Sequence, residues 1–383
     1  MILQELVDKK LTSPPEWLPN NVQNLSIMGS MAYGVNTDDS DFDLYGWCIP
    51  PKTVVFPHLT GHIAGFGKAP PNFKNWQDHH VQDPQANGGK GREYDFSIHN
   101  IVNYFQLLMD NNPNIIDSLF VPVNCILHST HVSNLVRDNR HMFLHKGCWH
   151  KFKGYAYSQL HKSKVKHQKA HELRRIEDEL GIDNSTTLEH AESLYKARLE
   201  ATELFERSIK ASLDVWGWVK SHFYIDHYGL EKAKKDLDNW TRYINTYRKL
   251  AETKTKRFDK VKSDGQDNKF LYHVVRLMSE VEQILSEGDL DLQEKGRREH
   301  MKAIRAGDVP DQEIRDWFSA KEKDLEALYR SSDLPYKPDE QKVKALLMNC
   351  LEHHYGSLEK CVSEMSRSEV AVEEIRKVLE TYA

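Results

Sequence analysis

The sequence has few of the features that mark secreted, membrane-spanning or nucleic-acid-coating proteins. Its 383 residues include only five cysteines. They are widely spaced and form no C-x-x-C pair, so we expect neither a disulfide framework nor a thiolate zinc site. No apolar run approaches the roughly 18 residues of a membrane span, and the first residues lack the apolar core of a signal peptide. The net charge of −5 gives no overall basic excess. We therefore expect a cytoplasmic protein that does not bind membranes.

The first third of the chain is rich in Gly, Pro and Asn and alternates short strand-like runs with loops. Three runs have the composition of strands: 22–28, 42–49 and 93–98. The last of them leads into a helix whose apolar residues recur at helical spacing from Ile101 to Met109. A second short helix follows at 114–120. The stretch 57–91 has several Gly and Pro and little periodicity, so we expect a long loop there.

From about residue 130 onward helical periodicity dominates, with no fixed-period repeat. Breaks between helices are expected at Gly181–Asn184, Gly229, Ser263–Asn268, Gly288, Gly307–Pro310 and Ser331–Lys337. We therefore predict an α/β (α+β) N-terminal domain with a small mixed sheet over residues 1–128, followed by a large all-α region over residues 129–383.

One segment, residues 27–43, combines a Gly-Ser pair at a strand end with an Asp-x-Asp at the start of the next strand. Side chains alternate along a strand, so Asp41 and Asp43 project from one face, about 6 to 7 Å apart at their Cα atoms. Two carboxylates placed in this way repel one another unless a cation lies between them. Gly29 allows a tight turn, and Ser30 can cap a following helix whose free N–H groups face phosphate oxygens. The pattern predicts Mg²⁺ and a polyphosphate at one edge of the sheet.

An acidic surface turn is the simpler interpretation of Asp38 to Asp43, because Asp-Asp-Ser is common in loops. That interpretation does not account for the Gly-Ser pair at a strand end, the spacing, or the hydrophobic strand that follows the acids.

The segment resembles the signature of the nucleotidyltransferase superfamily typified by DNA polymerase β, which is Gly-Ser, a spacer and Asp-x-Asp. More narrowly, G-S-x-A-Y-G-x-x-T-x-x-S-D-x-D-x-x-G, from Gly29 to Gly46, is similar to the nucleotidyltransferases associated with RNA ligases in bacteria and their viruses. Further likenesses lie in Asp95 before a helix that ends at Asn112-Pro113-Asn114, in Asp117-Ser118-Leu119-Phe120, in Lys269-x-x-x-His273-x-x-Arg276, and in Ile304-Arg305-Ala306-Gly307. Met31, Tyr45 and Asp117 depart from the family pattern.

The resemblance implies that Asp41, Asp43 and Asp95 are the catalytic residues and hold two Mg²⁺ ions, with Mn²⁺ as an alternative cation. Asp95 would be the third carboxylate, on the neighbouring strand, and Glu93 is the reserve candidate for that position. The two cations would clamp the α-phosphate of a nucleoside triphosphate such as ATP. A simple helix N-terminal acid is the alternative interpretation of Asp95.

The resemblance also implies a set of nucleotide-binding residues. Gly29, Ser30, Tyr33 and Ser40 would lie around the nucleotide. Lys269, His273 and Arg276 fall at i, i+4 and i+7 and would share a helical face that binds the nucleotide phosphates. Ordinary surface charges are the alternative for this face.

The net charge conceals an uneven distribution along the chain. Residues 1–120 contain 7 Lys and Arg and 13 Asp and Glu, whereas residues 137–175 contain 11 and 2, and residues 242–262 contain 8 and 2. Aromatic residues are interleaved in the two basic windows: Trp149, Phe152, Tyr155, Tyr157, Tyr243, Tyr247 and Phe258. Basic side chains can neutralise phosphates and aromatic rings can stack on unpaired bases, which favours an RNA partner. A solvated helix surface accounts equally well for these windows.

We therefore predict an enzyme, a Mg²⁺-dependent nucleotidyltransferase that moves an NMP from an NTP to a hydroxyl acceptor. The preferred acceptor is an RNA 3′ end, in particular that of a tRNA, in a bacterial or virus-encoded cytoplasmic protein. A protein acceptor, as in toxin–antitoxin relatives of the superfamily, and a small molecule, as in aminoglycoside-modifying relatives, are alternatives. A module that binds NTP or RNA without turnover is the alternative from another class of function.

Overall fold

A computed structural model describes residues 1–36, 42–63, 66–67, 72–180, 186–215, 220–251, 268–357 and 367–380. By its internal contacts the chain forms two compact units. The first unit comprises Met1–Ala156, Val275–Ala303 and Asp316–Ala383, and the second comprises Tyr157–Val274 and Ile304–Arg315. This division differs from the predicted boundary between residues 128 and 129, which follows the change in sequence composition and stays a prediction.

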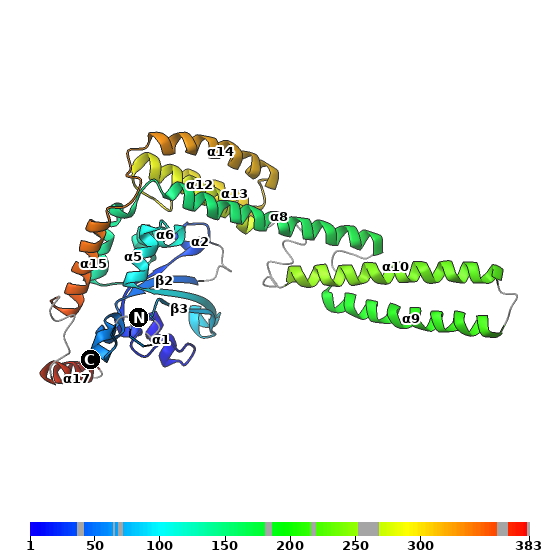
Figure 1. Ribbon diagram of the computed structural model, residues 1–383, viewed down its shortest axis with the longest axis horizontal. Coiled ribbons are helices and arrows are strands. Elements are labelled where there is room, and N and C mark those ends of the chain that lie inside the picture. The colour runs from blue at the N-terminus through cyan, green and yellow to red at the C-terminus, as the bar shows by residue number, and fades with distance from the viewer. Residues whose placement is uncertain are drawn as a thin grey trace. The chain divides into compact units, whose positions relative to one another are not determined.

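The first unit contains a mixed sheet, which is five-stranded within the described residues (Figure 1). Its strands are β1 Val22–Ile27, β2 Phe42–Cys48, β3 Asn75–Asp83, β4 Arg92–Asn100 and β5 Ile126–Ser129. They lie in the order β3-β4-β2-β1-β5. β2 and β4 run parallel, and the other neighbouring strands run antiparallel. The small mixed sheet and the three predicted strands are thus confirmed.

β3 lies within the stretch 57–91, which we expected to be a loop, and that expectation was wrong for Asn75–Asp83. β3 is an edge strand, and most of its side chains are polar and at least partly exposed. Val81 and Asp83 are its buried residues. Alternation of apolar and polar residues, the usual sequence signal of a half-buried strand, is therefore missing from this segment.

Short helices lie around the sheet. They are α1 Ile2–Asp8, α2 Gly29–Ala32, α3 Lys52–Val55, α4 Ala86–Gly89, α5 Ile101–Met109, α6 Pro113–Phe120 and α7 His131–Asp138. Short 3₁₀ helices connect them: η1 Pro19–Asn21, η2 Pro57–Thr60, η3 Val123–Cys125 and η4 Arg140–Phe143. Asn100 caps α5 by accepting a hydrogen bond from the N–H of Asn103. α5 packs on the sheet through Tyr104, which stacks on Trp47 with ring centroids 5.6 Å apart. Figure 1 shows α5 and α6 on one side of the sheet and α1 on the other.

Long helices make up most of the later chain, which confirms the predicted all-α C-terminal region. They are α8 Cys148–Leu180, α9 Leu188–Val215, α10 Lys220–Ala251, α12 Asn268–Glu287, α13 Lys295–Ala306, α14 Asp311–Ser331, α15 Glu340–Tyr355 and α17 Arg367–Glu380. In the described part of the chain, no helix is both long enough and apolar enough to cross a membrane.

Most of the predicted helix breaks that fall on described residues are confirmed. Gly288 ends α12 with φ +66°, and the breaks after α13 and α14 also lie where they were predicted. The break predicted at Gly229 is wrong, because α10 continues through it. A single glycine costs a helix only about 1 kcal/mol, which packing of the neighbouring turns can offset. The breaks predicted at 181–184 and 263–267 lie outside the described residues.

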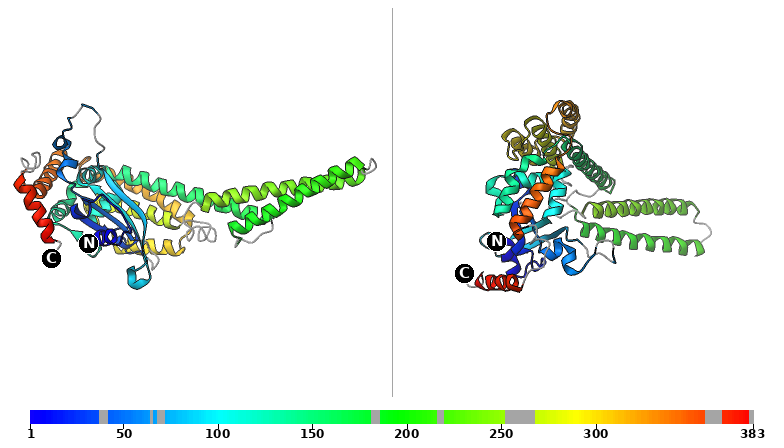
Figure 2. Two further views of the ribbon diagram at one scale, coloured as in Figure 1. Left: turned by 90° about the horizontal axis from the view of Figure 1, so that it is seen from below. Right: turned by 60° about the vertical axis from the view of Figure 1, so that its left-hand side comes forward.

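The second unit has its own apolar core between helices. α9 and α10 lie side by side as a long pair (Figure 2). The core cluster consists of Ile176, Ala191, Trp240, Tyr243, Ile244 and Tyr247. The Tyr243 hydroxyl donates a hydrogen bond of 2.9 Å to Glu177, which is also buried. The aromatic residues of α10 therefore hold this unit together.

Candidate active site

The parallel pairing of β2 and β4 sets Asp43 directly opposite Asp95. The next residues, Leu44 and Phe96, are fully buried, so the two carboxylates share the other face of the sheet. Neighbouring strands lie about 4.8 Å apart, so like charges in this register favour a cation between them. The structure thus brings together two of the three predicted carboxylates. Asp41 lies outside the described residues, as does Ser40.

Gly29 lies against the Asp43 carboxylate. Its φ is +64°, and a Cβ atom at this position would lie 2.1 Å from Oδ2 of Asp43. The backbone N–H of Met28 donates a 2.7 Å hydrogen bond to the Asp43 carbonyl, which ties the end of β1 to the start of β2. Only glycine permits both the left-handed backbone and this close approach. The Gly-Ser turn and the Asp-x-Asp strand therefore form one site.

Ser30 does not cap a helix, so that prediction is wrong. α2 has only four residues, and Met28 is its N-cap, without a side-chain hydrogen bond. Ser30 lies inside this single turn, where its carbonyl accepts a 2.9 Å hydrogen bond from the N–H of Val35. A one-turn helix has too few aligned peptides for a useful dipole, so we assign no anion site to its N-terminus.

A buried polar network lies beneath this turn. The Tyr33 hydroxyl donates a 2.8 Å hydrogen bond to Asp117 of α6. The guanidinium of Arg276, on α12, binds Asp117 and also Oε2 of Glu280 at 3.1 Å. It lies 4.6 Å from the centre of the Tyr33 ring. The Arg276 side chain is 4% exposed, and both carboxylates are fully buried. The network therefore links the turn to two helices that lie far apart in the sequence.

A second set of contacts holds the same turn from α13 and the loop before it. Gln293 donates a 3.2 Å hydrogen bond to the Ala32 carbonyl. A Cβ atom at Gly34, which has φ +66°, would lie 2.9 Å from Cδ of Arg298. No local sequence pattern indicates these contacts. The i, i+4 spacing of Arg276 and Glu280 was the one local signal for an ion pair in this region.

Glu280 should make the stability of the protein depend on pH. Burial raises the pKa of Glu280 to about 8, and Asp117 adds to this rise while Arg276 opposes it. A buried carboxyl with a raised pKa stabilises the fold below its unfolded pKa and loses that contribution as the pH rises through the folded value. The free energy of unfolding should therefore fall from about pH 5 to about pH 8, by at most about 1.4 kcal/mol per pH unit. Glu280→Gln should flatten this slope in urea denaturation, and parallel curves for the two proteins would contradict the assignment.

Tyr45 lies on the same strand face as Asp43, two residues further along β2. Burial raises the pKa of Tyr45 to about 12, and the negative charge of Asp43 acts in the same direction. The phenol is therefore neutral at physiological pH. Tyr45 therefore provides a neutral hydroxyl group at one of the positions where the sequence departs from the family pattern.

The three predicted phosphate-binding residues of α12 do not share one exposed face. Lys269 is exposed, His273 is half-buried with its ring 4.2 Å from that of Tyr272, and Arg276 is buried in the network described above. Helical spacing placed them on one side of α12 but did not reveal what covers that side. Their assignment to nucleotide phosphates stays a prediction.

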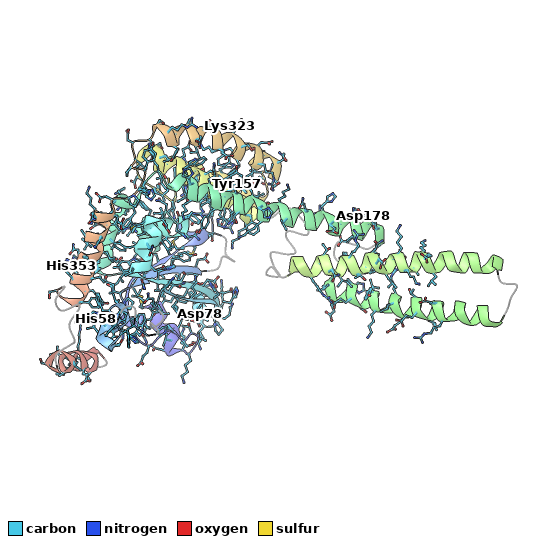
Figure 3. The ribbon with its side chains drawn as sticks, in the orientation of Figure 1. His58, Asp78, Tyr157, Asp178, Lys323 and His353 are labelled. Atoms are coloured by element: carbon cyan, nitrogen blue, oxygen red, sulfur yellow. The ribbon has the colours of Figure 1, made fainter. Side chains whose placement is uncertain are left out.

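Four aromatic residues of the basic windows cannot stack on bases, contrary to prediction. Trp149, Phe152, Tyr243 and Tyr247 are all buried. By contrast, Tyr155 and Tyr157 are 38% and 46% exposed, and Tyr157 is labelled on α8 in Figure 3. Basic side chains are exposed along the same helix at Lys151, Lys162, Lys164, Arg174 and Arg175. Phe258 lies outside the described residues. Basic side chains and two aromatic rings are therefore exposed to solvent along α8.

Comparison with known families agrees with this geometry. Residues 20–177 match the family RlaP, described as RNA repair pathway DNA polymerase beta family. Residues 20–177 are thus similar to a polymerase β-like nucleotidyltransferase family. The matched part runs from β1 into α8 and contains Gly29, Asp43 and Asp95. No curated protein and no solved structure matches the chain significantly.

Proposed function

We propose that the chain is a Mg²⁺-dependent nucleotidyltransferase that moves an NMP from an NTP, with ATP as one candidate, to the 3′ hydroxyl of an RNA. The observation that carries the proposal is the placement of Asp43 opposite Asp95 on parallel strands, against Gly29. The family match supports the reaction class and a setting in RNA repair. A tRNA is the preferred acceptor within this proposal.

The donor set fits hard divalent cations. Asp43 and Asp95 present carboxylates on one sheet face, and Asp41, two residues before Asp43, would add a third. Mg²⁺ binds one or two carboxylates and completes its shell with water and substrate phosphates, and Mn²⁺ accepts the same ligands. Two such ions, when bound, stabilise negative charge on the reacting phosphate and on the leaving pyrophosphate. We assign Asp41, Asp43 and Asp95 to this role.

The nucleotide would lie over the Gly-Ser turn. Gly29 and Ser30 are both partly exposed there. We keep Ser40, Lys269 and His273 as proposed contacts to the nucleotide. Tyr33 and Arg276 are buried beneath the turn, so in this proposal they hold its shape. A rigid support of this kind matters, because misplacement of reacting groups by about 1 Å can cost 10²-fold in rate.

The acceptor can be identified by following a labelled α-phosphate. The protein is incubated with Mg²⁺ and each labelled NTP in turn, together with an RNA, a protein extract or small hydroxyl compounds. We expect label on RNA with a free 3′ hydroxyl and none on the same RNA after periodate oxidation of its 3′ end. Label that appears only on protein, or only on a small molecule, would overturn the RNA acceptor and leave nucleotidyl transfer in place.

Gly29→Ala should disturb the site more than its backbone strain alone can explain. An alanine at φ +64° is strained by about 1 to 2 kcal/mol, and its Cβ would also displace the Asp43 carboxylate. We expect transfer to fall at least about tenfold. Gly88 is the matched control, because it has φ +65° with no atom within 4 Å of a built Cβ. Gly88→Ala should cost similar stability and leave transfer unchanged. Equal effects of the two substitutions on transfer would contradict this account.

A further inference from the structure

A bulge in the sheet brings two histidines to Asp95. Asp78 pairs with Phe96 and Val81 pairs with Tyr94, so His79 and His80 together oppose the single residue Asp95. His80 has φ +60°, a left-handed conformation that is uncommon for a residue other than glycine. Bulges re-aim side chains and are frequent beside functional sites. This one turns His80 toward β4.

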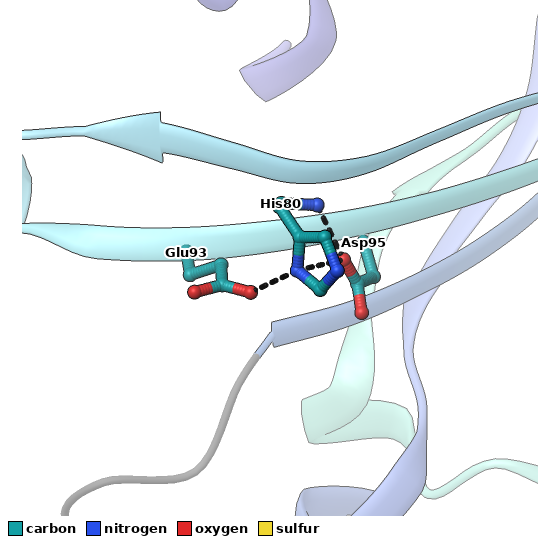
Figure 4. A group of neighbouring side chains, drawn as sticks. All are labelled: His80, Glu93 and Asp95. Carbon is teal, nitrogen blue, oxygen red and sulfur yellow. Dashed lines mark hydrogen bonds and ion pairs between the residues drawn. The ribbon is translucent and has the colours of Figure 1, made fainter. Parts of the chain in front are cut away.

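His80 contacts both acidic residues on the exposed face of β4 (Figure 4). Its backbone N–H donates a 2.7 Å hydrogen bond to Oδ1 of Asp95. Its Nδ1 lies 2.5 Å from Oε1 of Glu93 and 3.9 Å from Oδ1 of Asp95. Gln82 donates a 2.6 Å hydrogen bond to the other Glu93 oxygen, Oε2, which leaves Oε1 facing the imidazole. One nitrogen and two carboxylate oxygens are thus already oriented toward one another.

We propose that His80, Glu93 and Asp95 form a binding site for a divalent transition-metal ion of the Mn²⁺ to Zn²⁺ class. The three donor atoms lie within 4.8 Å of one another, and the group is the one such cluster found in the described part of the chain. Imidazole nitrogen favours transition metals, whereas Mg²⁺ prefers an all-oxygen shell. Three protein ligands drawn from His and carboxylates, with a further position open to water, are typical of zinc sites that bind substrate.

The observed distances suit such an ion after one small adjustment. Donor atoms bound at about 2.0 to 2.2 Å from a common ion lie about 3 to 4 Å from one another. The 3.9 Å separation of Nδ1 and Oδ1 falls in this range. The 2.5 Å separation of Nδ1 and Oε1 is that of a short hydrogen bond, and an ion bound between the two atoms would move them apart. The His80 side chain is 55% exposed, which gives an ion access from solvent.

This site shares Asp95 with the proposed nucleotidyl transfer but does not depend on that reaction. His80 and Glu93 are not among the residues assigned to the Mg²⁺ ions. An ion held by His80 and Glu93 would fix the Asp95 carboxylate in place, so here His80 and Glu93 act as positioning residues. The inference can therefore be tested by metal binding alone, with no nucleotide present.

The test measures metal binding to the full-length chain. Binding of Mn²⁺ is followed by the loss of the EPR signal of the free ion, and binding of Zn²⁺ by its competition with Mn²⁺. The variants are His80→Asn and Glu93→Gln. Asparagine tolerates the left-handed backbone at position 80, so the bulge should persist, and thermal melting checks the fold. We expect each variant to lose at least about tenfold in affinity for both ions. His161→Ala, at an exposed position of α8, should bind as the wild type does. His79→Ala is measured alongside, because Nδ1 of His79 also lies 3.7 Å from Oδ1 of Asp95, and it should lose less affinity than His80→Asn.

Wild-type affinity in folded His80→Asn and Glu93→Gln would overturn the site, as would a loss confined to His79→Ala. X-ray absorption at the zinc edge should show one imidazole ligand in the wild type and none in His80→Asn. Because transfer is not measured, tight His80-dependent binding by a protein without transferase activity would support this site and contradict the proposed function alone.

Discussion

Replacing Asp43 with asparagine is expected to lower nucleotidyl transfer by at least about 10³-fold, and Asp95→Asn should do the same. The amide keeps the size of the side chain but removes the negative charge that would hold a cation opposite the other carboxylate. The two residues should act as a unit, so the double variant should be little worse than either single one. Initial rates at saturating NTP measure the effect.

Asp110→Asn is the matched control for these two variants. Asp110 is exposed at the C-terminal end of α5, away from the facing carboxylates. This variant should keep the wild-type rate. All variants should unfold at similar urea concentrations, because Asp43 and Asp95 are partly exposed carboxylates outside the apolar core. If the double variant Asp43→Asn/Asp95→Asn forms product at a rate comparable to that of the wild type, neither residue is part of the active site.

Arg276→Met should be the most destabilising of the substitutions considered. It removes the cation that binds Asp117 and Glu280 and leaves both carboxyls buried without it. Breaking a buried ion pair from one side typically costs about 3 to 5 kcal/mol. Transfer should also fall, because Tyr33 loses the guanidinium that lies over its ring. Urea denaturation at neutral pH measures the loss of stability.

Two further variants distinguish the two possible causes of this loss of stability: a buried carboxylate left without its cation, and the loss of the packing of the Arg276 side chain. In Arg330→Met, an exposed pair with Glu326 is removed, and the cost should not exceed about 1 kcal/mol. In Arg276→Met/Asp117→Asn, one of the two orphaned carboxyls is also removed, and part of the lost stability should return. A double variant that is less stable than Arg276→Met would show that packing, and not charge, dominates at this position.

The two strands that carry the predicted carboxylates could be predicted from sequence, because the signals for a strand lie within its own residues. β2 and β4 contain runs of large apolar and aromatic residues that end in turn residues. The parallel pairing of the two strands is not a local property. Resemblance to the polymerase β-like signature supplied the expectation that Asp95 lies near Asp43, and the register of the sheet agrees with it.

β3 and its bulge could not be predicted, because an edge strand with polar side chains has no hydrophobic alternation. A bulge depends on the pairing of two strands, and the sequence His79-His80 alone does not specify it. The contacts of His80 with Glu93 and Asp95 therefore became visible only in the folded chain.

Helical spacing does not predict which face of a helix is exposed. It correctly indicated that residues three or four apart share a helix face, but a shared face can point inward. Arg276 and the aromatic residues Trp149 and Tyr243 all lie on faces that other helices cover. The charged Arg276 side chain can be buried because Asp117 and Glu280 bind it. Asp117 is 159 residues away in the sequence, so this partner could not be inferred from local spacing.

The most direct test of the central claim is a crystal structure of the protein with Mn²⁺ and a non-hydrolysable nucleoside triphosphate, recorded at the manganese absorption edge. We expect anomalous peaks about 2.0 to 2.3 Å from carboxylate oxygens of Asp43 and Asp95, with the triphosphate bound to the same ions beside Gly29. Nucleotide bound elsewhere on the chain, or at Gly29 with no ion at either carboxylate, would contradict it.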